Sequence, residues 1–279
     1  MRERTLALRE PRVMGIVNVT PDSFYDRAGG ADEALAQARA MVRAGAAVID
    51  VGGRSYAAGN GDVPEDEERA RVVPAVRAIA QAGLDVAISV DTVRASVADA
   101  ALRAGAHLVN DCSGLADARL VAVVAEHGAA LVVMHLRGRL AVREPEPFHY
   151  DDVVAEVGAY LAERAARALA GGVARDAVVL DPGLEFGKEP DADLEILARF
   201  GELRALGFPL LLAASRKRFL GRIVGKPAAE LLPASLAAVA AGVAGGARLI
   251  RTHDVAATVD AVRVLWAIAS ATRVPLGRF

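Results

Sequence analysis

The chain has 279 residues, of which 53% are hydrophobic, 24% are charged and only 4% are aromatic, and its formal net charge is -2. This composition is typical of a folded α/β domain and excludes a disordered chain, while the small net charge gives no electrostatic reason to expect nucleic acid or an anionic membrane as a partner. The single cysteine, Cys112, excludes an internal disulfide and a cysteine-based zinc site, and it fits a reducing compartment such as the cytoplasm. The N-terminus lacks a continuous apolar segment, and the Ala-rich residues 233–247 are too few to span a bilayer, so we expect neither export nor membrane insertion.

A short sequence pattern recurs along the chain: an Ala-rich helical stretch ends in Gly, and an apolar run then leads to a polar residue. Copies at residues 45–50, 105–110 and 246–251 align without gaps, and residues 128–133 form a near copy. Gly suits the left-handed residue that closes a helix, and the short apolar run suits a strand buried on both faces. The recurring pattern therefore predicts a repeated helix-to-strand unit.

Apolar runs along the whole chain predict eight strands that alternate with helices. The predicted strands are 14–17, 48–51, 87–90, 108–109, 131–134, 178–180, 210–213 and 249–250, and the clearest helices are 31–44, 65–82, 94–104 and 153–170. Eight alternating units favour an α/β fold of the (β/α)8 type, the TIM barrel, formed by residues 1–279 as a single domain. An open, doubly wound parallel sheet is the alternative.

Polar residues follow nearly every predicted strand, and in a barrel the loops after the strands share one face. Asp91, Asn110 and Asp181 stand at three of these strand ends. Their carboxylate and amide groups match the edge of a planar nitrogen heterocycle that carries amino and carbonyl groups. The sequence therefore predicts a binding site for such a ring. Alternatively, each residue caps the helix after its strand, which is a common role for Asp and Asn.

Cationic donors gather after the seventh and eighth predicted strands, at Arg216, Lys217, Arg218, Arg251 and His253. In a barrel this is the usual place for a phosphate group, so we expect a phosphorylated ligand. The alternative is a solvated basic patch, and Arg218 taken alone is expected to lie on the surface.

No residue spacing indicates a transition-metal site. The remaining histidines, His107, His127, His135 and His149, are expected to be structural or exposed. Asn18 is a neutral oxygen ligand suited to Mg²⁺ that is otherwise held by water and ligand phosphates. Walker-type, Rossmann and Gly-x-Ser-x-Gly motifs are absent from the sequence, so nucleotide hydrolysis, hydride transfer by a Rossmann fold and serine hydrolysis have no motif support.

Eight segments resemble, in order, the signature segments of the dihydropteroate synthase family of folate biosynthesis. They are residues 18–24, 89–92, 110–111, 134–135, 181–183, 186–188, 215–217 and 251–254. The ring-binding set Asp91, Asn110 and Asp181 is also similar to the one in pterin-dependent methyltransferase barrels. The Ser-Arg-Lys segment at 215–217 and the Arg-Thr-His segment at 251–253 favour the synthase.

The resemblance implies a transferase that joins a dihydropterin carrying a hydroxymethyl pyrophosphate to p-aminobenzoate and releases pyrophosphate. Pterin binding is implied for Asp91, Asn110, Asp181, Lys217, Met134 and Phe186, pyrophosphate binding for Asn18, Arg251 and His253, Mg²⁺ binding for Asn18, acceptor binding for Ser215 and Lys217, and catalysis for Lys217, Arg251 and His253. Cations that hold the departing pyrophosphate would stabilise the charge that develops on it, so little acid–base chemistry is needed. The resemblance also implies a homodimer.

The sequence departs from the family pattern in the second loop. The family reads Gly-Gly-Glu-Ser-Thr-Arg-Pro-Gly, whereas residues 52–59 read Gly-Gly-Arg-Ser-Tyr-Ala-Ala-Gly at the same length. The missing Thr and Arg help to hold pyrophosphate and complete the aminobenzoate pocket, so we expect an altered acceptor site and weak inhibition by sulfonamides, which imitate p-aminobenzoate. That Arg54 supplies a substitute guanidinium is a hypothesis.

Two smaller departures are Tyr25, where Ser is usual, and Glu185, which places a charge where a Gly usually approaches the pterin. The alternatives to an authentic synthase are a paralogue that binds pterin but uses another acceptor or has lost turnover, and a pterin-binding protein without turnover. The last is disfavoured by Lys217, Arg251 and His253, because a pure pterin binder needs no pyrophosphate site.

Overall fold

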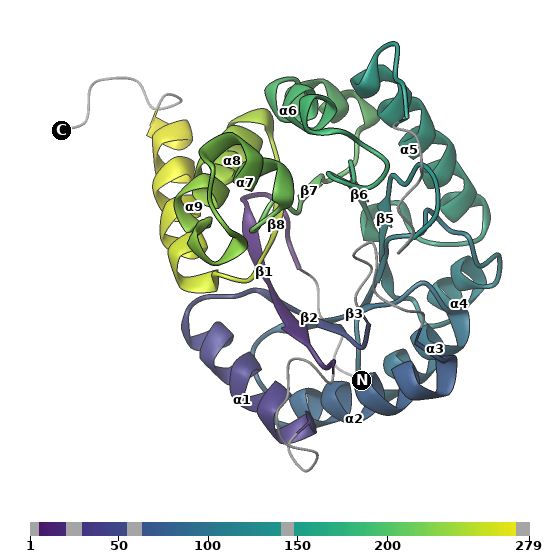
Figure 1. The fold of residues 1–279 in the computed structure, drawn as a ribbon. Helices are drawn as coiled ribbons and strands as arrows, with labels where there is room; N and C mark the ends of the chain where they lie inside the picture. The colour runs from purple at the N-terminus through teal and green to yellow at the C-terminus, as the bar shows by residue number, and fades with distance from the viewer. Residues whose placement is uncertain (1–5, 21–29, 55–62, 141–147, 272–279) are drawn as a thin grey trace.

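The computed structural model describes residues 6–20, 30–54, 63–140 and 148–271, in which eight parallel strands form a ring with helices around it (Figure 1). The strands are β1 (Arg12–Asn18), β2 (Val48–Gly52), β3 (Ala87–Asp91), β4 (Leu108–Asp111), β5 (Ala130–Met134), β6 (Val178–Asp181), β7 (Leu211–Leu212) and β8 (Leu249–Thr252). The helices are α1 (Gly30–Arg43), α2 (Glu65–Gln81), α3 (Ala95–Ala104), α4 (Leu120–Glu126), α5 (Val153–Ala170), α6 (Pro190–Ala198), α7 (Arg218–Val224), α8 (Leu232–Gly245) and α9 (Val255–Ala271). Short 3-10 turns are η2 (Arg175–Ala177), η3 (Phe200–Leu206) and η4 (Ala228–Glu230).

The sheet order β6-β5-β4-β3-β2-β1-β8-β7 leaves β6 and β7 as its two ends. A parallel bridge joins Leu180 to Leu210, and the Leu180 amide donates to the Pro209 carbonyl at 2.9 Å, so the two ends meet. The predicted (β/α)8 barrel is confirmed and the open-sheet alternative is wrong. The seventh strand is shorter than predicted because Leu210 forms only the isolated bridge to β6.

The glycines of the recurring sequence pattern end helices, as predicted. Gly45, Gly105 and Gly246 have φ angles of 98°, 116° and 103°. These left-handed values are strained for residues that carry a Cβ, so glycine lets each helix end sharply and turn into the next strand. Of the predicted helices, 153–170 has the observed bounds, and 65–82 ends one residue too late.

The barrel interior has two layers. The apolar layer contains Met14, Val48, Leu108, Val132, Val179, Leu211 and Leu249, all buried. Side chains two positions apart on a strand point to the same side, so the next interior layer receives Asp50, Asn110, Met134, Asp181 and Arg251. We call this second set of residues, together with Asp91 at the end of β3, which is bonded to Arg251, the polar layer.

The outward faces of the strands pack on the helices. Helix α2 buries Val72, Val76 and Ile79, which recur every three or four residues and therefore share one face of the helix. Burying such side chains contributes about 1.5–3 kcal/mol each, which holds the barrel and the polar layer in place. No helix of the described residues has both the length and the hydropathy of a membrane span.

Candidate active site

Arg251 links two carboxylates in the polar layer. Its Nε donates to Asp50 Oδ2 and its Nη2 donates to Asp91 Oδ2, both at 2.7 Å. Asn110 Nδ2 donates to the same Asp50 oxygen at 3.0 Å. Side chains from β2, β3, β4 and β8 are thus joined in one network at the C-terminal ends of the strands.

The remaining oxygens of the two carboxylates, Asp50 Oδ1 and Asp91 Oδ1, are buried and accept no hydrogen bond from the described residues. An unpaired buried acceptor costs about 1–3 kcal/mol, so a ligand that donates hydrogen bonds there would bind favourably. Burial raises the pKa of Asp91 to about 7 although Arg251 opposes it. Burial also disfavours the charge on Arg251, but Asp50 and Asp91 outweigh it and keep the Arg251 pKa above its ordinary value, so the guanidinium stays charged.

Asp181 lies at the end of β6, where its Oδ1 accepts a hydrogen bond from the Gly183 amide at 2.7 Å. Burial raises the pKa of Asp181, and the nearby Lys217 charge opposes that rise. Capping of the next helix by Asp91, Asn110 and Asp181 is wrong, because the N-cap residues of α3, α4 and α6 are Arg94, Arg119 and Glu189. The first amide of α3, at Ala95, donates to Asp117 at 3.0 Å instead of to Asp91.

An apolar wall lies beside the polar layer. Met134 and the buried Cys112 form a small cluster against which Phe186 packs. The Lys217 ammonium donates to the Leu184 carbonyl and lies 5.1 Å from the centre of the Phe186 ring. The structure therefore brings the predicted residues Met134, Phe186 and Lys217 together, and an apolar wall beside hydrogen-bonding groups suits a flat heterocycle.

The loop after β6 is held by a buried lysine. Lys188 Nζ donates to the Gly183 carbonyl at 2.8 Å and to the Phe186 carbonyl at 3.0 Å, and it lies 2.8 Å from His135 Nδ1. Burial, with the Lys188 charge, lowers the pKa of His135 to about 2, so the imidazole accepts from the lysine as a neutral group. His135 is structural, as predicted. A Cβ on Gly183 would lie 2.0 Å from the His135 carbonyl oxygen, so only glycine allows this close approach of the two loops.

Ser215 and His253 meet where β7 and β8 end. Ser215 Oγ lies 3.1 Å from His253 Nδ1 and accepts from the His253 amide at 3.2 Å. Loss of water around the imidazole and the Arg251 charge lower the His253 pKa, although the side chain keeps an exposed surface. A bound anion would oppose this shift and favour the protonated imidazole.

Arg216 corrects the expectation that all the cations after β7 face a phosphate. Its Nε and Nη2 donate to both carboxylate oxygens of Asp254 at 2.8 and 2.7 Å, and its Nη1 donates to the carbonyls of Ala228 and Ala229. The left-handed φ of 56° at Arg216 turns the backbone between Ser215 and Lys217. Arg216 therefore fastens this turn to η4 and to the loop after β8, whereas Lys217 faces the polar layer.

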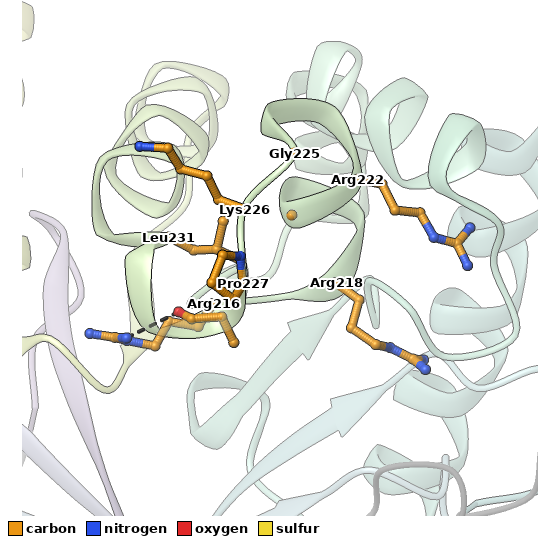
Figure 2. A pocket seen from close by; sticks show the side chains of 9 residues that line it. Arg216, Arg218, Arg222, Gly225, Lys226, Pro227 and Leu231 are labelled. Carbon is orange, nitrogen blue, oxygen red and sulfur yellow. Dashed lines mark hydrogen bonds between the residues drawn. The ribbon is translucent and has the colours of Figure 1, made fainter.

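An open pocket of about 370 Å³ lies between α7 and η4, lined by Arg216, Arg218, Arg222 and Lys226 among others (Figure 2). The Arg218 side chain is 72% exposed, as expected for a surface residue. Arg216 is already bound by protein groups, and Figure 2 shows the side chains of Arg218 and Lys226 pointing to opposite sides. None of the buried residues of the polar layer lines this pocket, so we identify the candidate site by its converging polar groups and not by this hollow.

Asn18 ends β1 in register with Gly52 of β2. A Cβ built on Gly52 would lie 3.7 Å from both Asn18 Oδ1 and Asp91 Oδ2, so the two side chains flank this glycine. The described residues contain no group of three or more His, Cys, Asp or Glu side chains that could hold a metal. A single amide oxygen fits Mg²⁺ only when water and ligand phosphates complete the coordination. Tyr25, residues 55–59 and Asp22 lie outside the described residues.

The pattern of polar residues after the strands did not predict the roles of Asp50 and Lys188. Asp50 was overlooked because it lies within its predicted strand and not after it. The recurring sequence pattern did indicate a site position for Asp50, because its alignment puts Asp50 in the same position as Asn110 and Arg251. Nothing in the composition around Lys188 predicts its burial, since a lysine that holds loop carbonyls has the same sequence appearance as an exposed one.

Comparison with known proteins agrees with this geometry. Residues 14–253 match the family described as pterin binding enzyme. Dihydropteroate synthase of Escherichia coli K12 is 41% identical over 271 residues, which cover 96% of this chain and 95% of that protein, and dihydropteroate synthase of Mycobacterium leprae is 42% identical over 278 residues, which cover 94% and 95%.

Solved structures agree as well. Dihydropteroate synthase of Yersinia pestis in a sulfonamide drug complex superposes with a TM-score of 0.90 at 39% identity, covering 96% of this chain and 98% of that one. Dihydropteroate synthase of Xanthomonas albilineans with 4-aminobenzoic acid has a TM-score of 0.88 at 39% identity, with 95% of each chain covered. The chain therefore belongs to the dihydropteroate synthase family of pterin-binding enzymes.

Proposed function

We propose that the protein is a dihydropteroate synthase, a transferase of folate biosynthesis that joins 6-hydroxymethyl-dihydropterin pyrophosphate to p-aminobenzoate and releases pyrophosphate. The observation that carries the proposal is the meeting of buried carboxylate and amide groups with cationic groups at one end of the barrel. Arg251 belongs to both sets, since it bonds Asp50 and Asp91 while it stands on β8, which ends directly before His253.

Asp91, Asn110 and Asp181 are assigned to the pterin. The unpaired Asp91 Oδ1 supports this role, because a pterin edge carries the N–H donors that such an acceptor lacks. Met134 and Phe186 would line the ring, with Lys217 beside Phe186. Each charge-assisted hydrogen bond would contribute about 1.5–3 kcal/mol, enough to select this ring over others of the same shape.

Arg251, His253 and Asn18 are assigned to the pyrophosphate. The bonds to Asp50 and Asp91 use two of the five N–H donors of the Arg251 guanidinium, so the others are available to an anion. We also propose that Asn18 holds Mg²⁺, which when bound would neutralise negative charge on the phosphate oxygens. The single amide oxygen at this position supports a magnesium ion shared with the substrate.

The acceptor amine is assigned to Ser215 and Lys217, which follow β7 beside the proposed pyrophosphate site. In the reaction the bond between the methylene carbon and the pyrophosphate oxygen breaks, and the electron pair leaves with the pyrophosphate. The lone pair of the amine nitrogen forms the new C–N bond, and the amine then loses one proton to solvent. Arg251, His253 and Lys217 serve as catalytic residues by stabilising the departing negative charge.

The second loop supports one alternative, a paralogue that binds the pterin but uses another acceptor or has lost turnover. Its support is the Arg-Ser-Tyr-Ala-Ala run at residues 54–58 in place of the family pattern. Weak inhibition by sulfonamides stays a prediction, since residues 55–59 lie outside the described part of the chain. We also propose a cytoplasmic location and a homodimer, as for the family that the chain resembles.

Turnover tests the proposal. Purified protein with Mg²⁺, the dihydropterin pyrophosphate and p-aminobenzoate should form dihydropteroate and pyrophosphate in equal amounts. Pyrophosphate release without dihydropteroate would replace the synthase with the paralogue that uses another acceptor. Pterin binding without either product would contradict the assignment as an enzyme.

A further inference from the structure

Glu185 has a left-handed backbone, with a φ of 68°, at the position where the family pattern has Gly. For a residue with a Cβ this conformation is strained relative to an ordinary one. Such a residue persists when its surroundings hold it, so its contacts show what its side chain contributes.

The Glu185 side chain ties the loop after β6 to the beginning of α7. Its Oε1 accepts a hydrogen bond from the Phe219 amide at 2.8 Å, and Phe219 is the second residue of α7. The Glu185 amide in turn donates to Asp193 Oδ1 at 2.8 Å, which fixes the loop against α6. The carboxylate is mostly shielded, with 18% of the side chain exposed.

Lys217 stands immediately before α7 and reaches back to the same loop. Its Nζ donates to the carbonyl of Leu184 and lies 5.1 Å from the Phe186 ring, so it contacts the residues on both sides of Glu185. The backbone of α7 is therefore tied to the loop by Glu185, and the Lys217 side chain closes the same connection from the other direction.

From this closed connection we propose that Glu185 is a positioning residue, which holds Lys217 over the Phe186 ring through the Phe219 amide and stabilises the Lys217 ammonium through its negative charge. The inference rests on the proposed function, since it deepens the role of Lys217 in pterin binding. Glu185 need not contact the substrate, because it acts through the position of the lysine.

The electrostatic surroundings support the second part of this role. Partial burial lowers the pKa of Lys217, and the groups that face it are Asp181 on β6, Glu185 in the loop, Asp193 on α6, Arg251 on β8 and Lys188. Asp181, Glu185 and Asp193 oppose the effect of burial, whereas Arg251 adds to it. Burial raises the pKa of Asp193 itself to about 7, which weakens its negative charge near neutral pH.

Substitutions of Glu185 separate the bond from the charge. Glu185→Gln keeps an acceptor oxygen for the Phe219 amide but removes the charge. Glu185→Gly removes both and relieves the left-handed backbone, so the chain should fold with a melting temperature near that of the parent. Glu189→Ala is the matched control, because Glu189 is a nearby carboxylate whose ion pair among the described residues is with the exposed Arg222, at 3.8 Å.

Two measurements compare the variants with the parent protein: pterin affinity and the titration of Lys217. Calorimetric titration with 6-hydroxymethylpterin reports affinity, and NMR of lysines labelled at the side chain reports the titration of Lys217. The sequence has three lysines, Lys188, Lys217 and Lys226, so few signals need assignment, and the exposed Lys226 serves as an internal reference.

We expect Glu185→Gly to weaken pterin binding about fivefold, comparable to the loss of one hydrogen bond to a helix terminus, and to lower the pH at which Lys217 titrates. Glu185→Gln should keep the parent affinity but shift the Lys217 titration, and Glu189→Ala should change neither. Parent-like affinity and titration in Glu185→Gly would overturn the proposal. Equal losses of affinity in Glu185→Gln and Glu185→Gly would overturn the positioning role of the bond.

Neither readout depends on turnover. If the parent protein binds pterin but forms no dihydropteroate, the proposed reaction fails while the Glu185 variants still test the positioning of Lys217. If turnover is observed, the affected variant should raise the KM for the pterin substrate with little change in kcat, since the ring is misplaced before the chemical step.

Discussion

The two sides of the candidate site are built differently. Asp50, Asp91, Asn110 and Asp181 are buried in the polar layer and held by hydrogen bonds and by the packed strands beneath them. His253, by contrast, keeps an exposed surface and bonds only to Ser215 among the described contacts of its side chain. A site whose groups are already in place loses little freedom on binding, whereas an exposed group must be ordered by its ligand. We infer that the pterin side is preformed and that the pyrophosphate side is completed by the substrate.

Arg251 connects the two sides, because it neutralises Asp50 and Asp91 before any ligand arrives. In the proposed reaction the pyrophosphate would therefore share a guanidinium that the groups assigned to the pterin already hold in place. A fixed cation of this kind needs no rearrangement as charge develops on the leaving group, which is how preorganised groups favour a transition state.

The largest effect is expected for Asp181→Ala, which removes a buried carboxylate assigned to the ring. Pterin affinity should fall about 100-fold, as for the loss of a strong charge-assisted hydrogen bond, while pyrophosphate affinity changes little. Calorimetric titration with each ligand measures both. Asp176→Ala, at an exposed residue just before β6, is the control. Equal loss of both affinities would show that the two sides are not separate.

The next effect concerns Asp91 and pH. Its pKa is about 7 in the folded protein and 3.8 for the ordinary group, so folding favours the protonated form. The stabilisation from this proton is complete below pH 3.8 and is lost as pH rises to about 7. Relative to Asp91→Asn, the free energy of unfolding of the parent should fall by on the order of 2 kcal/mol over this range, measured by urea titration. Parallel pH profiles for the two proteins would contradict the buried, raised state of Asp91.

A smaller effect is expected for His253→Ala on the exposed side. Pyrophosphate affinity should fall about tenfold, as for one charge-assisted hydrogen bond, and pterin affinity should stay the same. The pyrophosphate affinity of the parent should also weaken as pH rises through the histidine titration, since the lowered His253 pKa makes protonation depend on the bound anion. A variant with the parent pH profile would remove His253 from the pyrophosphate site.

The smallest effect is expected for Arg216→Met, which tests the difference between two neighbouring cations. Arg216 binds Asp254 and backbone carbonyls, so its loss should lower the free energy of unfolding by about 1 kcal/mol. Pyrophosphate affinity should be unchanged. A loss of affinity as large as that of His253→Ala would place Arg216 in the anion site and erase the distinction from Lys217.

Most of the barrel could be predicted from the sequence, because apolar runs and closing glycines repeat with each unit. The strand ends then located Asp91, Asn110, Asp181 and Arg251. Asp50 was missed because its position inside a strand hid it, and the partner of Arg216 was missed because no local pattern pairs it with Asp254, 38 residues away. Contacts between distant loops depend on three-dimensional packing, and a single sequence carries no direct signal for them.

The difference between the two sides is tested most directly by titrating the unmodified protein with the two halves of the substrate. Calorimetric titration with 6-hydroxymethylpterin would be carried out with and without saturating pyrophosphate and Mg²⁺. We predict that both ligands bind at once and that pyrophosphate leaves the pterin dissociation constant unchanged or lowers it. Mutual exclusion of the two ligands would contradict separate pterin and pyrophosphate sides joined by Arg251.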